Sequence, residues 1–499
     1  MFIDSALHDL APDDRALFAV FGAGPVRTPP FDQVHHAFEA RAARHPDVPA
    51  VEHLGESLTY GELDSRASLL AELLVRRGVR AGDHVGLFLS RSASMVVGTL
   101  AVLKAGAVAV LQDPRTASER HLRHVVRTAR IDLVLTTSKD SLPSHLAEVV
   151  AIDALPPLPA FRRTPTAESE VAAVVFTSET GVPVSHAALC NLVLTSPGAL
   201  DVGPGTRVAQ LLHVASGPAL WEVFCALANG GTLVLRGDDA ERTASTADVV
   251  IATPSVLETI DPDACRNAHT VAVTGERCPR ALADAWSRHA RFLNAWGRTD
   301  LGLVTTVEQH EPDFEPLAIG RPVPNTTVYV LDDERRPCPI GAIGELWVGG
   351  PGVVERYTGL DPAARRYRPD PFLGEGHVMF RTRDLVRWTD DGRLEHHGRV
   401  DDLVEVRGFR VALNAVTSAL ENAVDRAATL VHDGRLAAFV TPADASPDAA
   451  RKAVARRLPY YCVPILVVAV DALPSTGLGK VDRRALVSWL DRERQAPVA

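Results

Sequence analysis

Hydrophobic positions follow two different periods along the first 150 residues. Segments with an apolar residue every three to four positions are typical of amphipathic helices, and they alternate with short apolar runs that are typical of buried strands. The helical pattern covers residues 31–46 and 62–78, and the strand pattern covers 84–90, 107–112 and 131–137. Because helices and strands alternate, this part of the chain predicts a parallel α/β sheet.

A polar, proline-rich connector at residues 154–170 precedes a second series of the same kind. Its strands are predicted at 171–178, 207–215, 231–236, 247–253 and 270–275. After about residue 318 the pattern changes to β, and a small αβ unit with its own apolar cluster follows from residue 401. Turn residues gather at 398–402 between two apolar runs, so we place the main boundary there.

The predicted fold class is therefore α/β, with several subdomains in a large N-terminal domain. We expect a leader wrapped on the surface (1–30), a large domain of α/β subdomains plus a β-rich subdomain (31–400), and a small αβ C-terminal domain (401–499). The length of 499 residues, too great for one compact core, agrees with this division.

Composition narrows the class of protein. The net charge of −10 and the pI of about 6.0 speak against a surface for nucleic acid or for anionic membranes. No apolar run is long enough to span a bilayer and no signal peptide is recognisable, so we expect a cytoplasmic protein. The six cysteines lie far apart without metal-ligand spacing, which favours free core thiols.

Lysine is rare in this chain. Four of the 52 basic residues are lysines, namely Lys104, Lys139, Lys452 and Lys480. Arginine and lysine are not interchangeable, so each remaining lysine marks a position where an arginine does not serve equally well.

Several motifs with particular spacing follow one another along the chain. They are LTYGEL (58–63), LKAGAVAVLQDP (103–114), LNAWGRTD (293–300), GELWVGGPGVVERY (344–357), FRTRDL (380–385), GRVDDLVEVRGFRV (398–411), LPYYCVP (458–464) and LPSTGLGKVDR (473–483). Together, over residues 31 to about 487, they closely resemble the adenylation domains of nonribosomal peptide synthetases, within the acyl-adenylate-forming ligase superfamily.

The resemblance implies a small mobile C-terminal lid and a two-step reaction that uses ATP and Mg²⁺. A carboxylic acid first attacks the α-phosphate of ATP, giving acyl-AMP and pyrophosphate, and a phosphopantetheinyl carrier protein then takes the acyl group on its thiol. No carrier motif follows the lid, so the carrier is expected to act in trans. A small activator protein is a further partner to consider.

The resemblance assigns the catalytic roles to three residues. Lys480 would stabilise the charge that develops between the carboxylate and the α-phosphate. Asp384 would hold both ribose hydroxyls, which suits a two-acceptor carboxylate. Arg399 would bridge ribose and phosphate with its guanidinium, and Asp401 would be the hinge of the lid. Arg383 stands where the family has glycine.

Nucleotide contacts are implied along two further segments. Trp296 replaces the tyrosine that covers adenine, and Asp300 replaces a magnesium-binding glutamate. Arg298 stands in place of a proline, and we leave open whether it compensates for a missing lysine or is a surface residue. The remaining assignments to nucleotide binding are Gly275, Glu276, Asn294, Gly297 and Thr299.

The family's phosphate-binding loop is altered here. Its residues Thr177, Ser178, Thr180 and Gly181 align, but one loop position is deleted and Glu179 stands among the hydroxyls. The lysine that follows in the family is absent. A carboxylate beside a triphosphate disfavours binding, and a lost cationic donor lowers a rate by about 10²–10³-fold if it acts in the transition state. We interpret the segment as a damaged phosphate loop.

The acid-binding segment departs from the family as well. Gly217 stands where the family has the aspartate that binds the ammonium group of α-amino acids. A buried ammonium without a counter-charge is costly, so an acid without an α-ammonium group is predicted. The predicted pocket wall is His213, Gly217, Pro218, Trp221, Ala295 and Leu303. Plain core packing is an equally good reading of the last five.

Three functions remain open at this point. The first is an adenylation enzyme that activates an unusual carboxylic acid for a carrier protein. The second is a repurposed acyl or thioester transferase that no longer uses ATP normally, and the third is a non-catalytic scaffold. The neighbouring His35 and His36 lack the motif of condensation enzymes, and we interpret them as a surface pair.

Overall fold

The structure, a computed structural model, describes residues 7–140, 142, 145–154, 168–176, 180–312, 317–353, 366–406, 409–476 and 481–495. Side chains are not described at 401, 403, 405, 409, 410 and 493–495. The chain divides into two compact units, one with Ala19–Val328 and Val348–Phe380, the other with Leu7–Phe18, Tyr329–Trp347 and the residues from Arg381 onward. The domain boundary at 398–402 stays a prediction.

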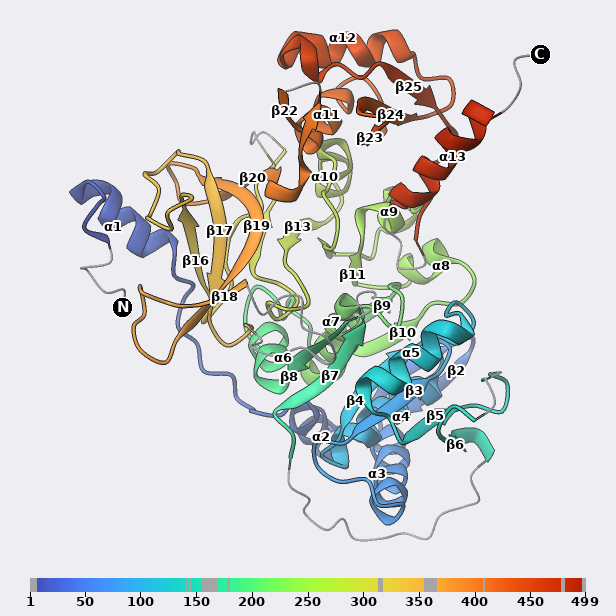
Figure 1. The fold of residues 1–499 in the computed structure, drawn as a ribbon. Helices are drawn as coiled ribbons and strands as arrows, with labels where there is room; N and C mark the ends of the chain where they lie inside the picture. The colour runs from blue at the N-terminus through green and yellow to red at the C-terminus, as the bar shows by residue number, and fades with distance from the viewer. Residues whose placement is uncertain are drawn as a thin grey trace. The chain divides into compact units, whose positions relative to one another are not determined.

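A six-stranded sheet carries the first α/β series, as predicted (Figure 1). Its order is β6 (Glu148–Ala151), β5 (Leu133–Thr136), β3 (His84–Phe88), β4 (Val108–Gln112), β7 (Val171–Phe176) and β8 (Gly181–Ser185). All pairs are parallel except β7 and β8, which form a hairpin. Strand β4 is buried along its whole length, as expected for a central parallel strand with helices on both faces.

A nine-stranded sheet carries the second series. Its order is β15 (Arg321–Pro322), β14 (Thr306–Gln309), β13 (Arg291–Trp296), β12 (Thr270–Val273), β11 (Val249–Ala252), β9 (Arg207–Gln210), β10 (Thr232–Leu235), β1 (Pro49–His53) and β2 (Glu56–Thr59). The strands from β13 to β1 are parallel. Their carboxyl ends therefore lie along one edge of the sheet.

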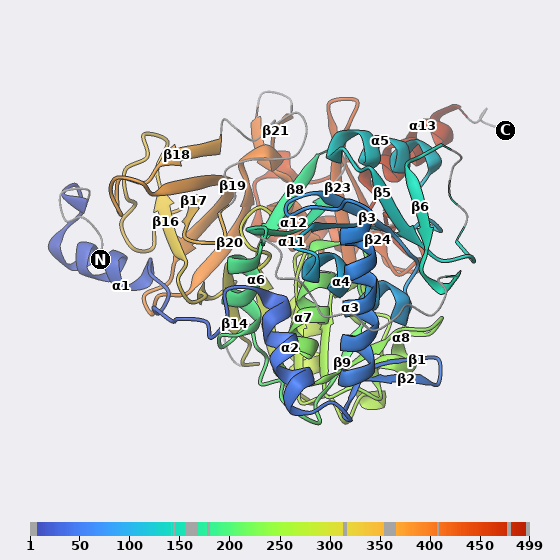
Figure 2. The same ribbon diagram turned by 90° about the horizontal axis from the view of Figure 1, so that it is seen from below.

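Helices α2 (Val34–Arg44), α3 (Tyr60–Arg76) and α4 (Ala93–Lys104) lie side by side, as Figure 2 shows. Helix α3 begins with a capping box, in which Thr59 accepts from the Glu62 backbone and the Glu62 side chain accepts from Thr59. Helix α4 is buried from Met95 to Lys104 and is apolar on all sides except for Thr99 and Lys104. Such a helix must be covered on every face.

Further helices connect the strands of these sheets. They are α5 (Glu119–Ala129), α6 (His186–Val193), α7 (Gly217–Asn229), α8 (Ala240–Ala244), α9 (Pro254–Leu257) and α10 (Arg280–Ser287). Helix α7 packs against α2, α6 and strand β9. It is the helix that follows β9, so its first residues lie at the carboxyl edge of the nine-stranded sheet.

A five-stranded sheet accounts for the predicted β-rich region. Its strands are β16 (Thr327–Leu331), β17 (Gly344–Gly349), β19 (Val378–Trp388) and β18 (Tyr367–Pro369), and β20 (Leu394–Arg399) pairs with β19. The N-terminal segment contributes helix α1 (Pro12–Phe21), and its Phe18 is fully buried and stacked on Tyr329 at 6.4 Å between ring centroids. Through Phe18, this part of the leader packs against strand β16.

The C-terminal part forms the predicted small αβ unit. It contains the hairpin β21 (Leu403–Val406) and β22 (Phe409–Ala412), a sheet of β23 (Arg426–His432), β24 (Arg435–Thr441) and β25 (Leu466–Ala469), and helices α11 (Leu413–Leu420), α12 (Pro447–Arg457) and α13 (Arg483–Gln495). Its buried side chains, from Val406 to Val467, form a core of their own. The predicted α/β fold class, with this C-terminal unit, is confirmed.

All six cysteines are free and buried, which confirms the expectation of core thiols. Burial raises the pKa of the Cys190 thiol to about 12 and that of Cys265 and Cys338 to about 11. Within the described part of the chain, no helix combines the length and the apolar character that crossing a membrane requires.

Candidate functional site

Most of the predicted site residues lie where parallel strands of the nine-stranded sheet end. His213 and Gly217 follow β9, Gly275 and Glu276 follow β12, and the segment from Gly297 follows β13. Because β9, β11, β12 and β13 are parallel neighbours, these segments emerge at the same edge of the sheet. The carboxyl edge of an open α/β sheet is where such folds bind ligands.

The segment after β12 is fixed by its own contacts. Gly275 has φ of 88°, a left-handed conformation that favours glycine. The carboxylate of Glu276 accepts hydrogen bonds from the backbone N–H of Ser255 at 3.1 Å and from its hydroxyl. Asn294, near the end of β13, is buried and donates to the carbonyl of Ala318 at 2.7 Å. Trp296 closes β13 and is half-exposed.

Asp300, the predicted magnesium ligand, is held by Arg298. The guanidinium donates from Nε to Oδ1 and from Nη2 to Oδ2, both at 2.9 Å, in a bidentate pair. Asp300 is only 5 % exposed, and the Arg298 guanidinium lies 5.6 Å from the centroid of the Phe380 ring. A Mg²⁺ ion would compete for the same oxygens, so the pair does not fit a ready-made magnesium site. Arg298 is paired with Asp300 in this structure, and whether it compensates for the missing lysine or is a surface residue stays open.

The predicted acid pocket is tightly packed around Gly217, the first residue of α7. A Cβ placed on Gly217 would lie 2.8 Å from Cδ2 of Leu303 and 3.0 Å from Oγ1 of Thr299. Both distances are shorter than a normal van der Waals contact. The structure thus brings these three predicted residues together, and an aspartate at position 217 would require the Leu303 and Thr299 side chains to move.

The other predicted wall residues surround this contact. Trp221 is fully buried, and its Nε1–H donates to the carbonyl of Gly198 at 2.8 Å. Ala295 is 3 % exposed, and Pro218 is partly exposed. In this structure the predicted wall is mostly well-packed core, so any bound acid must be small or must displace Leu303.

A buried polar network beneath the pocket was not found from the sequence. The Glu222 carboxylate on α7 accepts from the backbone N–H groups of Leu211 and Leu212 at 2.7 and 3.1 Å, and from the side-chain amide of Gln210 at 2.8 Å. Arg91 donates to Gln210 and to the carbonyl groups of Leu211 and Leu212. Burial raises the pKa of Glu222 to about 8. The network fixes residues 210–212, which lead directly into the pocket segment.

His213 comes next along the chain. Its Nδ1 accepts from the backbone N–H of Ala215 at 3.3 Å, so the proton is on Nε2, which donates to Oγ1 of Thr116 at 2.8 Å. Burial lowers the pKa of His213. Both ring nitrogens of His213 therefore make hydrogen bonds, and its role as a pocket-wall residue stays a prediction.

Asp384 and Arg399, the predicted ribose ligands, pair with each other across β19 and β20. Arg399 Nη1 donates to Oδ2 of Asp384 at 2.9 Å, and His396 Nε2 donates to Oδ1, also at 2.9 Å. Asp384 is 4 % exposed. The carboxylate is thus oriented from both sides, which is the pre-organisation that a two-hydroxyl ligand needs. His396 in this role was not predicted.

Several predicted residues lie outside the described part of the chain. These are Thr177, Ser178 and Lys480, and for Asp401 the side chain is not described. The ends of the phosphate loop are described: Phe176 pairs with Gly181 across the β7–β8 hairpin, and Thr180 precedes that pair. A Cβ on Gly181 would lie 2.7 Å from Cγ1 of Val174, so this glycine is sterically required.

Arg383 adopts φ of 66°, at the position where the family has glycine. A left-handed conformation costs an ordinary L-residue roughly 1 kcal/mol. The variant Arg383→Gly is therefore expected to raise the free energy of unfolding by about 1 kcal/mol, measured from the urea midpoint. Arg383→Ala is the matched control, because it removes the side chain but keeps the Cβ. Equal stability of the two variants would contradict the argument.

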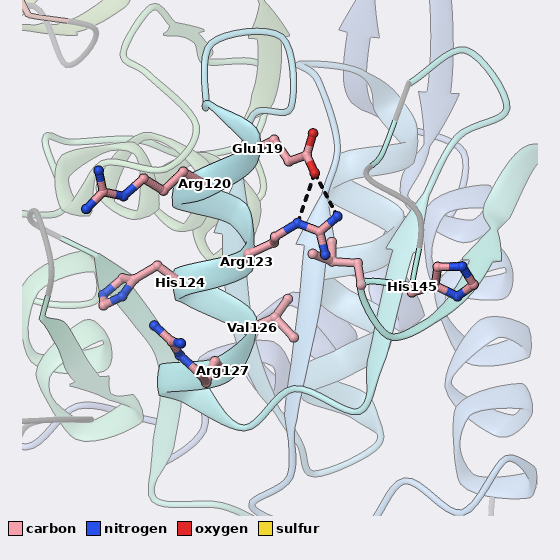
Figure 3. A pocket seen from close by; sticks show the side chains of 8 residues that line it. Glu119, Arg120, Arg123, His124, Val126, Arg127 and His145 are labelled. Atoms are coloured by element: carbon pink, nitrogen blue, oxygen red, sulfur yellow. Dashed lines mark hydrogen bonds and ion pairs between the residues drawn. The ribbon is translucent and has the colours of Figure 1, made fainter.

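A cavity of about 560 Å³ lies along α5, lined by Glu119, Arg120, Arg123, His124, Val126, Arg127, His145 and Leu146. Figure 3 shows Arg120, His124 and Arg127 on one side of α5, and Arg123, which pairs with Glu119, on the side facing His145. None of the residues predicted for the nucleotide or the acid lines this cavity. It is a positively charged hollow on a chain whose net charge is −10.

Comparison with known proteins gives the family. The family model described as AMP-binding enzyme matches residues 38–358. An adenylate-forming reductase of Coprinopsis cinerea is 38 % identical over 500 residues, covering 96 % of this chain and 49 % of that protein. Novobiocin biosynthesis protein H of Streptomyces niveus is 33 % identical over 489 residues, covering 90 % of this chain and 81 % of that protein. The chain thus spans about half the length of the first relative.

Among solved structures, a four-domain nonribosomal peptide synthetase bound to AMP and glycine superposes with a TM-score of 0.85 at 26 % identity, covering 95 % of this chain and 38 % of that one. The family match covers well over half of the chain. The chain is therefore a member of the AMP-binding enzyme family, and its fold and sequence are those of the adenylation domains of nonribosomal peptide synthesis.

Proposed function

We propose that this chain activates a carboxylic acid without an α-ammonium group as an acyl-adenylate and passes the acyl group to the thiol of a phosphopantetheinyl carrier protein. The observation that carries the choice of acid is the packing at Gly217. No carboxylate stands there, and Leu303 and Thr299 fill the space that one would need. An ammonium group buried beside them would have no counter-charge.

In the first step, a carboxylate oxygen of the acid attacks the α-phosphorus of ATP, and the bond to the departing pyrophosphate breaks. Asp384 would hold the ribose hydroxyls, with His396 and Arg399 keeping its two oxygens in place. Trp296 would cover the adenine, beside Gly275, Glu276 and Asn294. Lys480 would stabilise the charge between the acid and the α-phosphate.

In the second step, the carrier thiol loses its proton to solvent and attacks the acyl carbon, and AMP leaves. This step needs no β- or γ-phosphate, so the altered loop at 177–181 bears only on the first step. Because the Arg298–Asp300 pair occupies the oxygens that would bind Mg²⁺, we assign no step to a metal at Asp300. The carrier in trans, an activator protein and a cytoplasmic location stay part of the proposal.

The ion pair between Arg298 and Asp300 supports a second candidate function. With Asp300 neutralised and the phosphate loop altered, the chain would transfer acyl groups to or from carrier thiols without making its own adenylate. Under this alternative a ready-made acyl-adenylate or thioester would be a substrate, while ATP and a free acid would give no product.

The test is pyrophosphate exchange with pooled acids, using the full chain. One pool holds aryl and hydroxy acids, a second holds β-amino acids and a third holds α-amino acids. We expect exchange with the first pool, at least tenfold less with the third, and loss of exchange in Asp384→Asn. Exchange that is strongest with α-amino acids would reject the choice of acid. Absence of exchange in every pool, with transfer from a supplied acyl-adenylate, would favour the second candidate.

A further inference from the structure

Three potential metal ligands meet at the start of α2. The Nε2 atom of His36 lies 2.8 Å from Oε1 of Glu168, and the Nε2 atom of His35 lies 3.9 Å from the same oxygen. In the part of the chain that the structure describes, this is the group in which three ligand atoms of His, Cys, Asp or Glu fall within 4.8 Å of one another. His35 and His36 are neighbours in α2, while Glu168 comes from the segment that leads into β7.

The spacing is close to that of a zinc site. Zinc bonds of about 2.0–2.2 Å in tetrahedral geometry place neighbouring ligand atoms about 3.4 Å apart. The distances from Glu168 Oε1 to the Nε2 atoms of His36 and His35 lie on either side of this value, each within roughly 0.6 Å of it. Small changes of side-chain rotamer would therefore bring both contacts into range. The Glu168 side chain can change rotamer in this way, because it is 32 % exposed and lies at the surface.

We propose that His35, His36 and Glu168 form a Zn²⁺ site, separate from the nucleotide site, that ties α2 to the entry of strand β7. Two imidazole nitrogens and one carboxylate oxygen suit zinc, whereas Mg²⁺ prefers oxygen ligands alone. Three protein ligands leave a fourth position for water. The half-exposed His36 and the exposed Glu168 give the ion a path from solvent.

Other contacts already hold the start of α2 next to the segment that precedes β7. His186, the first residue of α6, accepts at Nδ1 from the backbone N–H of Val34 at 3.2 Å, and its ring lies 5.5 Å from that of His35. The Gln33 side chain donates to the carbonyl of Ser169, next to Glu168, at 3.3 Å. The start of α2 and the segment before β7 are thus held together with or without the ion. The positive end of α2 disfavours a cation modestly, and the charge of Glu168 opposes that effect.

The test is titration of the full, chelator-treated chain with Zn²⁺ by calorimetry, and separately with Mg²⁺. The variants are His36→Ala and Glu168→Gln, with His45→Ala as the matched control, because His45 is exposed at the other end of the same helix. We expect one Zn²⁺ per chain for the wild type and for His45→Ala. Zinc affinity should fall at least about tenfold in the other two variants. Mg²⁺ should give no saturable heat at this site.

Circular dichroism in the presence of chelator checks that each variant is folded. If His36→Ala is not folded, Glu168→Gln alone decides, because the substitution keeps the size and shape of the side chain and removes only its charge. No zinc binding by the wild type would overturn the proposal. So would equal binding by all four proteins, which would point to other histidines among the 18 in the chain. Neither result bears on adenylation, since no nucleotide or acid is present in the titration.

Discussion

The variant Lys480→Ala is expected to lower the rate of acyl-adenylate formation by about 10²–10³-fold, the usual loss when a group that stabilises transition-state charge is removed. Lys480 itself lies outside the described residues, but the ends of its loop are described. Ser475 pairs with Val481, and the backbone N–H of Asp482 donates to the carbonyl of Pro474 at 2.7 Å. The described residues on either side of 477–480 therefore lie close together, just before α13. Pyrophosphate exchange measures the effect.

Lys452→Ala is the matched control, because Lys452 is exposed on α12 of the same unit. It should leave exchange unchanged. A second readout, acyl transfer to carrier from a supplied adenylate, separates the candidate functions: under the leading proposal Lys480→Ala should affect it much less than exchange. If Lys480→Ala and Lys452→Ala behave alike in exchange, Lys480 has no catalytic role.

The variant Lys104→Met is expected to lower the free energy of unfolding by about 2–4 kcal/mol. Lys104 ends α4, is 3 % exposed and places Nζ 2.5 Å from Oε1 of Glu39 and 2.7 Å from Oδ1 of Asp64. Removing the ammonium leaves two carboxylates facing each other beside an apolar side chain. The first unfolding transition in urea measures the loss.

The control substitutes an exposed lysine. The variant Lys452→Met should have the same free energy of unfolding as the wild type. A Lys104→Met chain as stable as the wild type at neutral pH would show that the ion pairs do not stabilise the fold. Lys104→Arg is a further comparison, since it keeps the charge but replaces the compact ammonium with a larger planar guanidinium.

The α/β architecture could be predicted because its signals are local. Alternating helix and strand patterns predicted β3, β4 and β5, and the residues of β9, β11 and β12 lie within the predicted apolar runs. The motif at 293–300 runs past the end of β13, whereas the motif at 380–385 lies within β19.

Contacts between distant segments were beyond prediction. Lys104 has the same signature in the sequence as a solvated lysine, and its partners lie 65 and 40 residues away. The bidentate pair of Arg298 and Asp300 joins residues only two positions apart, but it depends on the conformation of one loop, which the pattern of the sequence does not specify. The interpretation of His35 as a surface residue is wrong, since it is fully buried; a helical period alone did not show which face is covered.

The burial of all six cysteines has a practical consequence for work on the thiol chemistry proposed above. A folded chain offers a thiol-selective reagent no exposed cysteine, and burial raises the pKa of Cys190, Cys265 and Cys338 well above neutrality. Thiolate is the reactive form, so these side chains are poor nucleophiles. In a mixture with a carrier protein, fluorescent maleimides or disulfide dyes would therefore react with the free thiol of the pantetheine arm and leave this chain unlabelled. The amount of free carrier thiol, and hence the loading of the carrier, could then be followed continuously.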